Sequence, residues 1–169
     1  CQHGDRRVAR MDAPLSAPEP KFITLADNYG GKRLNSPNDA AYKSNGDLYF
    51  TDPPYGLVKG AADPGRELDF CGVYRLSADG AVSLLTKEMT RPNGIAFSPD
   101  EKTLYVAYSN VREPRVRAFD VSATGKLSNE RVFVDCTNPA RRVRTRGNSA
   151  RRHSGRPTGW WNFTTRAFA

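Results

Sequence analysis

A chain of 169 residues, 38% of them hydrophobic, is long enough to bury one sizeable core, and no apolar run approaches the roughly 20 residues of a membrane-spanning helix. The formal net charge of +8 is typical of nucleic-acid binding, but residues 1–137 carry 18 basic and 18 acidic side chains and are neutral. The excess lies in residues 138–169, which hold eight arginines and no Asp or Glu, so neither a nucleic-acid nor a membrane partner is expected for the folded part.

Two strands are predicted at the start of the chain, at residues 6–11 and 21–25, on either side of a Pro-rich loop and before a Gly30-Gly31 turn. The turn Pro37-Asn38-Asp39 then opens a longer pattern: an apolar stretch, a polar turn and a strand that ends at Asp52. Pro-Pro-Tyr-Gly breaks that strand, and a loop is expected as far as Asp69.

The second half of the chain repeats this pattern. A hairpin is predicted over residues 71–85, around Ala-Asp-Gly. Pro92-Asn93-Gly94 follows 55 residues after the first Pro-Asn turn and again opens a strand, a polar turn and a second strand. A last hairpin is predicted over residues 115–134. No segment shows a sustained helical period, so the fold is expected to be all-β.

The period of the repeat is typical of a propeller blade. Two blades are predicted, at 34–85 and 92–134, and the first two strands end another, which gives about two and a half blades. A propeller needs at least about four blades to close, so this chain is expected to self-associate through open blade edges. The apolar side chains expected to lack neighbours are Val82, Leu84, Phe97, Leu104 and Val106.

The cysteines and the start of the chain carry less information. Cys1, Cys71 and Cys136 lack CxxC spacing and are odd in number, so ordinary buried or partly buried thiols are expected. The chain has no initiator Met and no signal-peptide pattern and begins in mid-pattern, so its true start is expected to be missing. We expect a soluble protein of the cytoplasm or periplasm, and the sequence does not choose between them.

The basic tail, residues 138–169, has no strand or helix pattern, and three interpretations stay open. It is a solvated native tail, a nucleic-acid-binding arm in which Trp160-Trp161 stack on bases, or the product of a shifted reading frame. With suitable synonymous codons, Arg151–Pro157 read one base forward encode Gly-Gly-Ile-Pro-Asp-Gly-Leu. That shifted segment would open a further blade.

The two asparagines are the candidate site. In a propeller, the turns that enter each blade lie at one end of the central channel, so Asn38 and Asn93 are expected to converge there. An amide oxygen is a hard ligand suited to Ca²⁺ or Mg²⁺ and tolerated by Zn²⁺. The alternative is that each Asn only caps its own turn, and the sequence leaves both interpretations open.

Other polar residues are expected to have structural roles. His3 is expected to be hydrogen-bonded rather than a metal ligand, and Asp39 and Asp52 to bind turn amides. Tyr55 either lines the mouth of the pocket or covers the blade. The tip 100–102 is expected to be solvated.

Four segments together resemble the SMP-30/gluconolactonase/LRE family, most closely its bacterial gluconolactonase branch. They are Cys-Gln-His-Gly-Asp-Arg-Arg-Val at 1–8, Arg-Leu-Asn-Ser-Pro-Asn-Asp at 33–39, Tyr-Phe-Thr-Asp-Pro-Pro-Tyr-Gly at 49–56 and Arg-Pro-Asn-Gly at 91–94. The resemblance covers about residues 1–137. It implies part of a six-bladed propeller from a lactone hydrolase with one divalent cation, Ca²⁺ before Zn²⁺, Mg²⁺ or Mn²⁺, in the channel.

The resemblance also implies roles for individual residues. Asn93 matches a metal ligand, and Asn38 matches a residue on the substrate side. A metal-binding Glu would precede Cys1, and the Asp expected as general base is absent from the tail as translated. Ser36 stands where some members have a substrate-binding Arg. The expected substrate is a sugar lactone, the fragment is expected to be inactive alone, and the alternative is a non-catalytic propeller fragment that binds protein or carbohydrate.

Overall fold

The computed structural model describes residues 1–137, so the predicted tail at 138–169 lies outside the described residues. These residues form twelve strands and one short 3-10 turn, η1 (Gly60–Ala62). The strands are β1 (Val8–Met11), β2 (Phe22–Ala26), β3 (Asn28–Tyr29), β4 (Lys32–Arg33), β5 (Ala40–Tyr42), β6 (Leu48–Asp52), β7 (Gly72–Leu76), β8 (Val82–Thr86), β9 (Pro92–Phe97), β10 (Thr103–Tyr108), β11 (Arg115–Val121) and β12 (Leu127–Asp135). No helix in this part of the chain is long and apolar enough to span a membrane.

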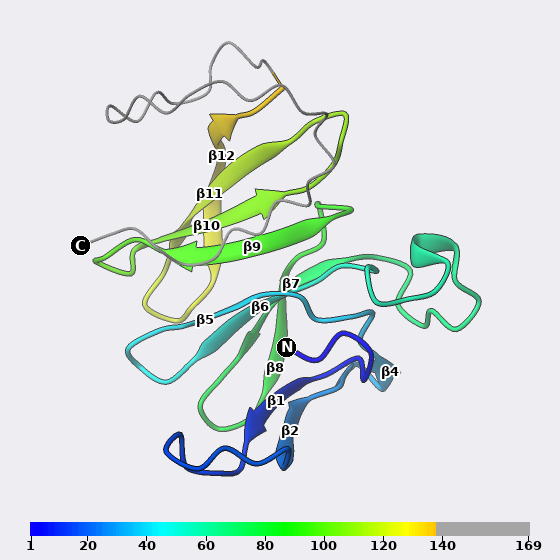
Figure 1. Cartoon of the computed structure of the whole chain (residues 1–169). Helices are drawn as coiled ribbons and strands as arrows, with labels where there is room; N and C mark the ends of the chain where they lie inside the picture. The colour runs from blue at the N-terminus through cyan, green and yellow to red at the C-terminus, as the bar shows by residue number, and fades with distance from the viewer. Residues whose placement is uncertain (138–169) are drawn as a thin grey trace, which may run out of the picture.

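Two four-stranded antiparallel sheets, β5-β6-β7-β8 and β9-β10-β11-β12, follow each other along the chain and lie one above the other (Figure 1). In each sheet the strands pair in sequence order, the meander of a propeller blade. β1 and β2 pair as part of a further sheet, and β3 and β4 form a small hairpin across Gly30-Gly31. The prediction of an all-β partial propeller with these two blades is confirmed.

Strand β6 lies between two hydrophobic clusters, and all its residues are buried. Because side chains alternate across a strand, Leu48 and Phe50 join the cluster shared with β1 and β2, whereas Tyr49 joins the cluster between the two blades. The first cluster comprises Val8, Ala26, Leu34, Leu48, Phe50, Leu68, Tyr74 and Leu76, and the second comprises Tyr49, Val73, Met89, Ile95, Leu104, Val106, Tyr108 and Phe119.

The expectation that several apolar side chains would lack neighbours is wrong. Leu104 and Val106 are fully buried between the blades, and the Phe97 ring packs edge-on against Tyr49. Val82 and Leu84 pack against the first cluster. Neighbouring blades bury each other's faces without a closed ring, so the core does not depend on closure.

Some of the large apolar side chains left exposed lie on strands at the open ends of the array, whereas Leu15, Val58 and Val111 lie in loops. Val132 and Phe133 of β12 are half exposed, and Phe22 and Ile23 of β2 are also exposed. These strands are edges of their sheets. Exposed edges of this kind favour pairing with another chain.

The three cysteines are all free. The expectation of buried or partly buried thiols holds for Cys71, but Cys1 and Cys136 are exposed. Burial raises the pKa of the Cys71 thiol to about 11, so this residue is a small apolar group of the core rather than a nucleophile.

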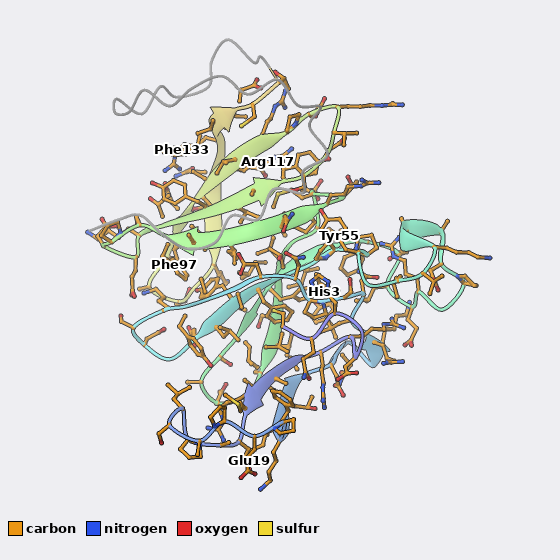
Figure 2. The ribbon with its side chains drawn as sticks, in the orientation of Figure 1. His3, Glu19, Tyr55, Phe97, Arg117 and Phe133 are labelled. Atoms are coloured by element: carbon orange, nitrogen blue, oxygen red, sulfur yellow. The ribbon has the colours of Figure 1, made fainter. Side chains whose placement is uncertain are left out.

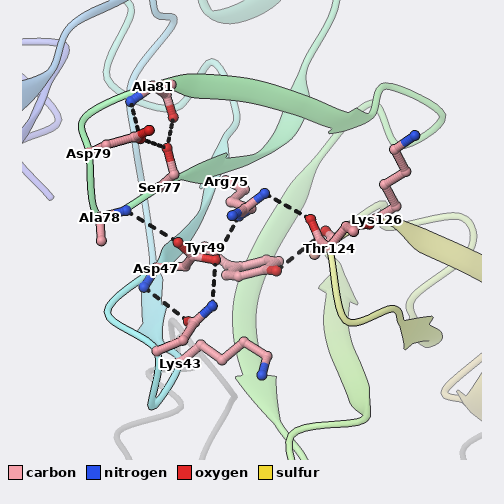
Figure 3. A network of polar contacts seen from close by, with 12 residues as sticks. Lys43, Asp47, Tyr49, Arg75, Ser77, Ala78, Asp79, Ala81, Thr124 and Lys126 are labelled. Carbon is pink, nitrogen blue, oxygen red and sulfur yellow. Dashed lines mark hydrogen bonds and ion pairs between the residues drawn. The ribbon is translucent and has the colours of Figure 1, made fainter.

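A polar network joins the two blades at the end opposite the Pro-Asn turns (Figure 3). Arg75 donates through Nε to Asp47 Oδ2 (2.7 Å) and through Nη1 to the carbonyl of Thr124 (2.9 Å) in the next blade. Tyr49 donates its hydroxyl to the carbonyl of Gly125 at 3.3 Å. The β11–β12 turn is therefore held directly against the first blade.

A second polar link joins the turns of the two blades. The tip at 100–102 is exposed at Asp100 and Lys102, as predicted, but Glu101 is half-buried. Glu101 accepts hydrogen bonds from the Ser44 backbone and hydroxyl (2.8 and 2.7 Å) and from Lys43 Nζ (3.2 Å). Glu101 adopts a positive φ of 55°. The repeat places equivalent turns side by side, which is why a residue that is exposed in one hairpin meets the next blade.

Candidate functional site

The two candidate asparagines enter neighbouring blades and are joined through one residue. Asn38 precedes β5, and Asn93 lies at the start of β9. Thr51 of β6 accepts the Asn38 N–H at its carbonyl (2.9 Å) and donates its hydroxyl to the Asn93 carbonyl (2.8 Å). The structure therefore brings both turns to the same end of the blade pair, as the repeat predicted.

The Asn93 side chain is held by its nitrogen. Asn93 Nδ2 donates to Ser109 Oγ (2.9 Å), and the Ser109 N–H donates to the Arg91 carbonyl (3.0 Å). No group among residues 1–137 donates a hydrogen bond to Asn93 Oδ1. The half-buried amide is thus held through its nitrogen.

Asn38 is held in a similar way by a residue far away in the sequence. Asn38 Nδ2 donates to His3 Nε2 at 2.9 Å. Burial, followed by the positive charge of the N-terminus, lowers the pKa of His3, and a hydrogen bond with the Asn38 backbone acts in the opposite direction. A neutral His3 is therefore favoured, as an acceptor for the amide requires. His3 is hydrogen-bonded as expected, but its partner is the candidate substrate residue.

The turn before Asn38 is built around a buried carboxylate. Asp52 accepts the N–H groups of Asn35 at Oδ2 (2.8 Å) and Ser36 at Oδ1 (2.7 Å). Burial raises the pKa of Asp52 to about 6 and outweighs these two hydrogen bonds, which favour the charged form. Asp52 is fully buried, so it binds turn amides as predicted and does not face the site.

Ser36 stands where some family members have a substrate-binding Arg, but here it belongs to the structure of the turn. The buried Ser36 hydroxyl donates to the Pro53 carbonyl and accepts the Gly56 N–H, both at 2.7 Å. Gly56 in turn lies directly against the His3 backbone. The Pro-Pro-Tyr-Gly segment is therefore fastened across the start of the chain.

Gly56→Ala is expected to destabilise this corner by about 1–3 kcal/mol, because overpacking a filled space forces the backbone to shift. A Cβ at residue 56 would lie 2.8 Å from the His3 carbonyl oxygen and 2.8 Å from Ser36 Cβ. Gly4→Ala is the matched control, since nothing lies within 4 Å of a Cβ there. Equal urea midpoints for the two variants would contradict the close packing.

Two further predicted residues lie at this end. Asp39 accepts the Ile95 N–H at 3.0 Å and the Ala40 N–H at 2.9 Å, so it binds backbone amides, as expected, and ties β9 to the first blade. The half-exposed Tyr55 directs its hydroxyl to the Arg91 carbonyl at 3.5 Å, beside the second Pro-Asn turn. Figure 2 shows Tyr55 and His3 at the same end of the first blade.

Ligands for a cation are sparse among the described residues. No three His, Cys, Asp or Glu side chains within residues 1–137 lie together in a way that fits a metal ion. Asn93 Oδ1 offers one neutral oxygen ligand, but the nearby Asp39 carboxylate is engaged with backbone amides. A cation at this end would need ligands from outside the described residues.

A surface groove of about 420 Å³ lies elsewhere, lined by residues 24–30 with Gly80 and Val82. Neither candidate asparagine lines it. We base the candidate site on the convergence of polar groups, because a channel needs more blades around it than residues 1–137 provide.

The sequence did not reveal the residues that fix the asparagines. His3 and Thr51 lie in the family segments at 1–8 and 49–56, but those segments did not show which residue each would contact, because the contacts join residues far apart in the sequence. For Ser109 the one available signal was position: it directly follows β10, the second strand of the second repeat.

Comparison with known proteins gives a family. The SMP-30/gluconolactonase/LRE-like region matches residues 4–147. The chain is 45% identical over 122 residues to a gluconolactonase of Zymomonas mobilis, over 72% of this chain and 33% of that protein. A solved gluconolactonase of Xanthomonas campestris has a TM-score of 0.67 at 38% identity, over 79% of this chain and 43% of the other. A solved luciferin-regenerating enzyme has a TM-score of 0.56 at 26% identity, over 76% and 40% of the two chains.

The chain matches only part of the length of these relatives. The chain spans 33% of the first of these relatives and 43% of the second. On the side of this chain, the match includes both Pro-Asn turns and both described blades and extends to residue 147. The chain therefore belongs to the SMP-30/gluconolactonase/LRE-like family.

Proposed function

We propose that this chain is part of a lactonase that hydrolyses a sugar lactone such as gluconolactone. The observation that carries the proposal is the pair of asparagines, each with its amide nitrogen hydrogen-bonded to another side chain, at the same end of two neighbouring blades. The family relatives described as gluconolactonases support the same activity. A neutral oxygen pair in this position suits the recognition of a polar, uncharged substrate.

Asn38 would accept hydrogen bonds from ring hydroxyls of the lactone and so orient it. Asn93 Oδ1 would be one ligand of a divalent cation, Ca²⁺ before Zn²⁺, Mg²⁺ or Mn²⁺, with the remaining ligands supplied from outside residues 1–137. When bound, such a cation polarises a carbonyl and lowers the pKa of a bound water. Tyr55 and the turn held by Ser36 would form one wall of the site and limit the entry of water.

The 169-residue chain alone is expected to show little or no turnover of gluconolactone, because one oxygen ligand does not retain a cation. The measurement is lactone hydrolysis by the purified chain with added Ca²⁺ or Zn²⁺, against the rate without protein. Turnover well above that background would show that the chain is catalytically complete and that our assignment of ligands is wrong.

In a complete propeller that carries this segment, Asn38→Ala and Asn93→Ala are each expected to lower kcat/KM at least tenfold. Only Asn93→Ala is expected to weaken the binding of the cation, measured by calorimetry. Asn28→Ala is the control, since Asn28 is exposed, lies outside the two Pro-Asn turns and directs its side-chain nitrogen to Asp27. Unchanged activity in both site variants would favour the alternative, a non-catalytic propeller that binds protein or carbohydrate.

A further inference from the structure

The contact between His3 and Asn38 joins the start of the chain to the entrance of the first blade. His3 Nε2 lies 2.9 Å from Asn38 Nδ2, across 35 residues of sequence. The ring is partly buried. His3 is thus placed to act on the amide of Asn38.

The His3 backbone is itself fixed on several sides. The His3 carbonyl accepts the Arg6 N–H at 3.1 Å, and Gln2 and Arg7 pair as an isolated bridge around it. Gly56 packs against the same carbonyl from the other side. These contacts fix the backbone from which the His3 ring reaches Asn38.

The position of the imidazole matters because the oxygen and the NH₂ group of an amide side chain have nearly the same shape but opposite hydrogen-bonding roles. Rotation of the Asn38 amide by half a turn exchanges its oxygen and its nitrogen, and so exchanges an acceptor for a donor. An unprotonated Nε2 can only accept a hydrogen bond, so it binds the NH₂ group and rejects the oxygen. The orientation of the amide is then decided by the tautomer of His3.

We infer that His3 is a positioning residue that holds the Asn38 amide with its nitrogen toward the imidazole and its oxygen toward the open end of the blades. The inference deepens the proposed function and rests on it for the role of Asn38 in binding a lactone. It predicts a neutral ring with the proton on Nδ1. His3 itself does not touch the lactone.

The test is ¹⁵N NMR of the histidine ring in the full chain at pH 8, recorded with magic-angle spinning so that self-association does not prevent it. The chain has two histidines, so His153→Gln assigns the signals. We expect an unprotonated Nε2 and a protonated Nδ1 in His3. Asn38→Ala is expected to shift His3 toward the Nε2–H form that prevails in water, whereas Asn28→Ala leaves it unchanged.

Either of two results would overturn the inference: a protonated Nε2 in the unchanged chain, which would turn the Asn38 oxygen toward His3, or a His3 spectrum that does not respond to Asn38→Ala. A second measurement uses the complete propeller. His3→Ala is expected to lower kcat/KM about tenfold, equivalent to about one hydrogen bond, and His3→Gln, which restores an acceptor, to recover most of it. Equal losses in both variants would also overturn the inference. Absence of lactone hydrolysis in the unchanged propeller contradicts the proposed function alone, because the tautomer is measured without activity.

Discussion

Arg75→Met is expected to lower the free energy of unfolding by about 3 kcal/mol, because it leaves the Asp47 carboxylate buried without its cation. The Asp47 side chain is only 4% exposed and accepts the Arg75 Nε hydrogen bond at 2.7 Å. Methionine keeps the apolar stem of the side chain, so the loss is mainly electrostatic. It also removes the hydrogen bond to the Thr124 carbonyl of the second blade. The measurement is urea unfolding followed by circular dichroism.

Two variants separate this effect from a general loss of a surface arginine. Arg112 is exposed, so Arg112→Met should change the free energy by less than about 0.5 kcal/mol. In an Asp47→Asn background, Arg75→Met should cost less than half as much, because no orphan charge remains. An undiminished cost in that background would show that the blade contact, and not the ion pair, carries the energy.

Asp52 is expected to make the chain less stable as the pH rises from 4 to 7. Burial raises its folded-state pKa from 3.8 to about 6, so within this range the native state binds more protons than the unfolded state. The stabilisation that comes from the proton on buried Asp52 is complete below the pKa of Asp52 in the unfolded state. It is lost as the pH rises through the pKa of Asp52 in the folded state. A difference of about 2 units corresponds to about 3 kcal/mol.

The measurement is the free energy of unfolding at pH 4 and pH 7 for the unchanged chain and for Asp52→Asn. Contributions from other titrating groups cancel in the comparison. The change in free energy between the two pH values should therefore differ by about 2 kcal/mol between the two chains, because pH 4 is not yet below the unfolded pKa. Asp69→Asn, which removes an exposed carboxylate, should leave the pH dependence nearly parallel to that of the unchanged chain. If Asp52→Asn also runs parallel, the pKa of Asp52 is the same in the folded and unfolded states, and the hydrogen bonds to the carboxylate offset burial.

The sequence was sufficient to predict the all-β class, the two blades and the shared position of the two asparagines. Strands and turns are visible in the sequence because alternating side chains and Gly, Asp and Asn turns are local signals. A repeat after 55 residues predicts that equivalent residues occupy equivalent positions in successive blades. The Pro37-Asn38 and Pro92-Asn93 turns repeat in this way. The boundary at residue 137, the native metal and the lactone stay predictions.

Only the tertiary structure decided which side chains are buried and what each polar residue contacts. Leu104 and Val106 look exposed when a blade is considered alone, but they are buried because the neighbouring sheet covers them. The sequence predicts that Glu101 is solvated, but in the folded chain it accepts a hydrogen bond from the Ser44 turn of the neighbouring blade. The His3–Asn38 hydrogen bond likewise joins residues 35 positions apart. Such contacts depend on how separate elements of the chain pack together, and the sequence pattern of a single strand does not predict them.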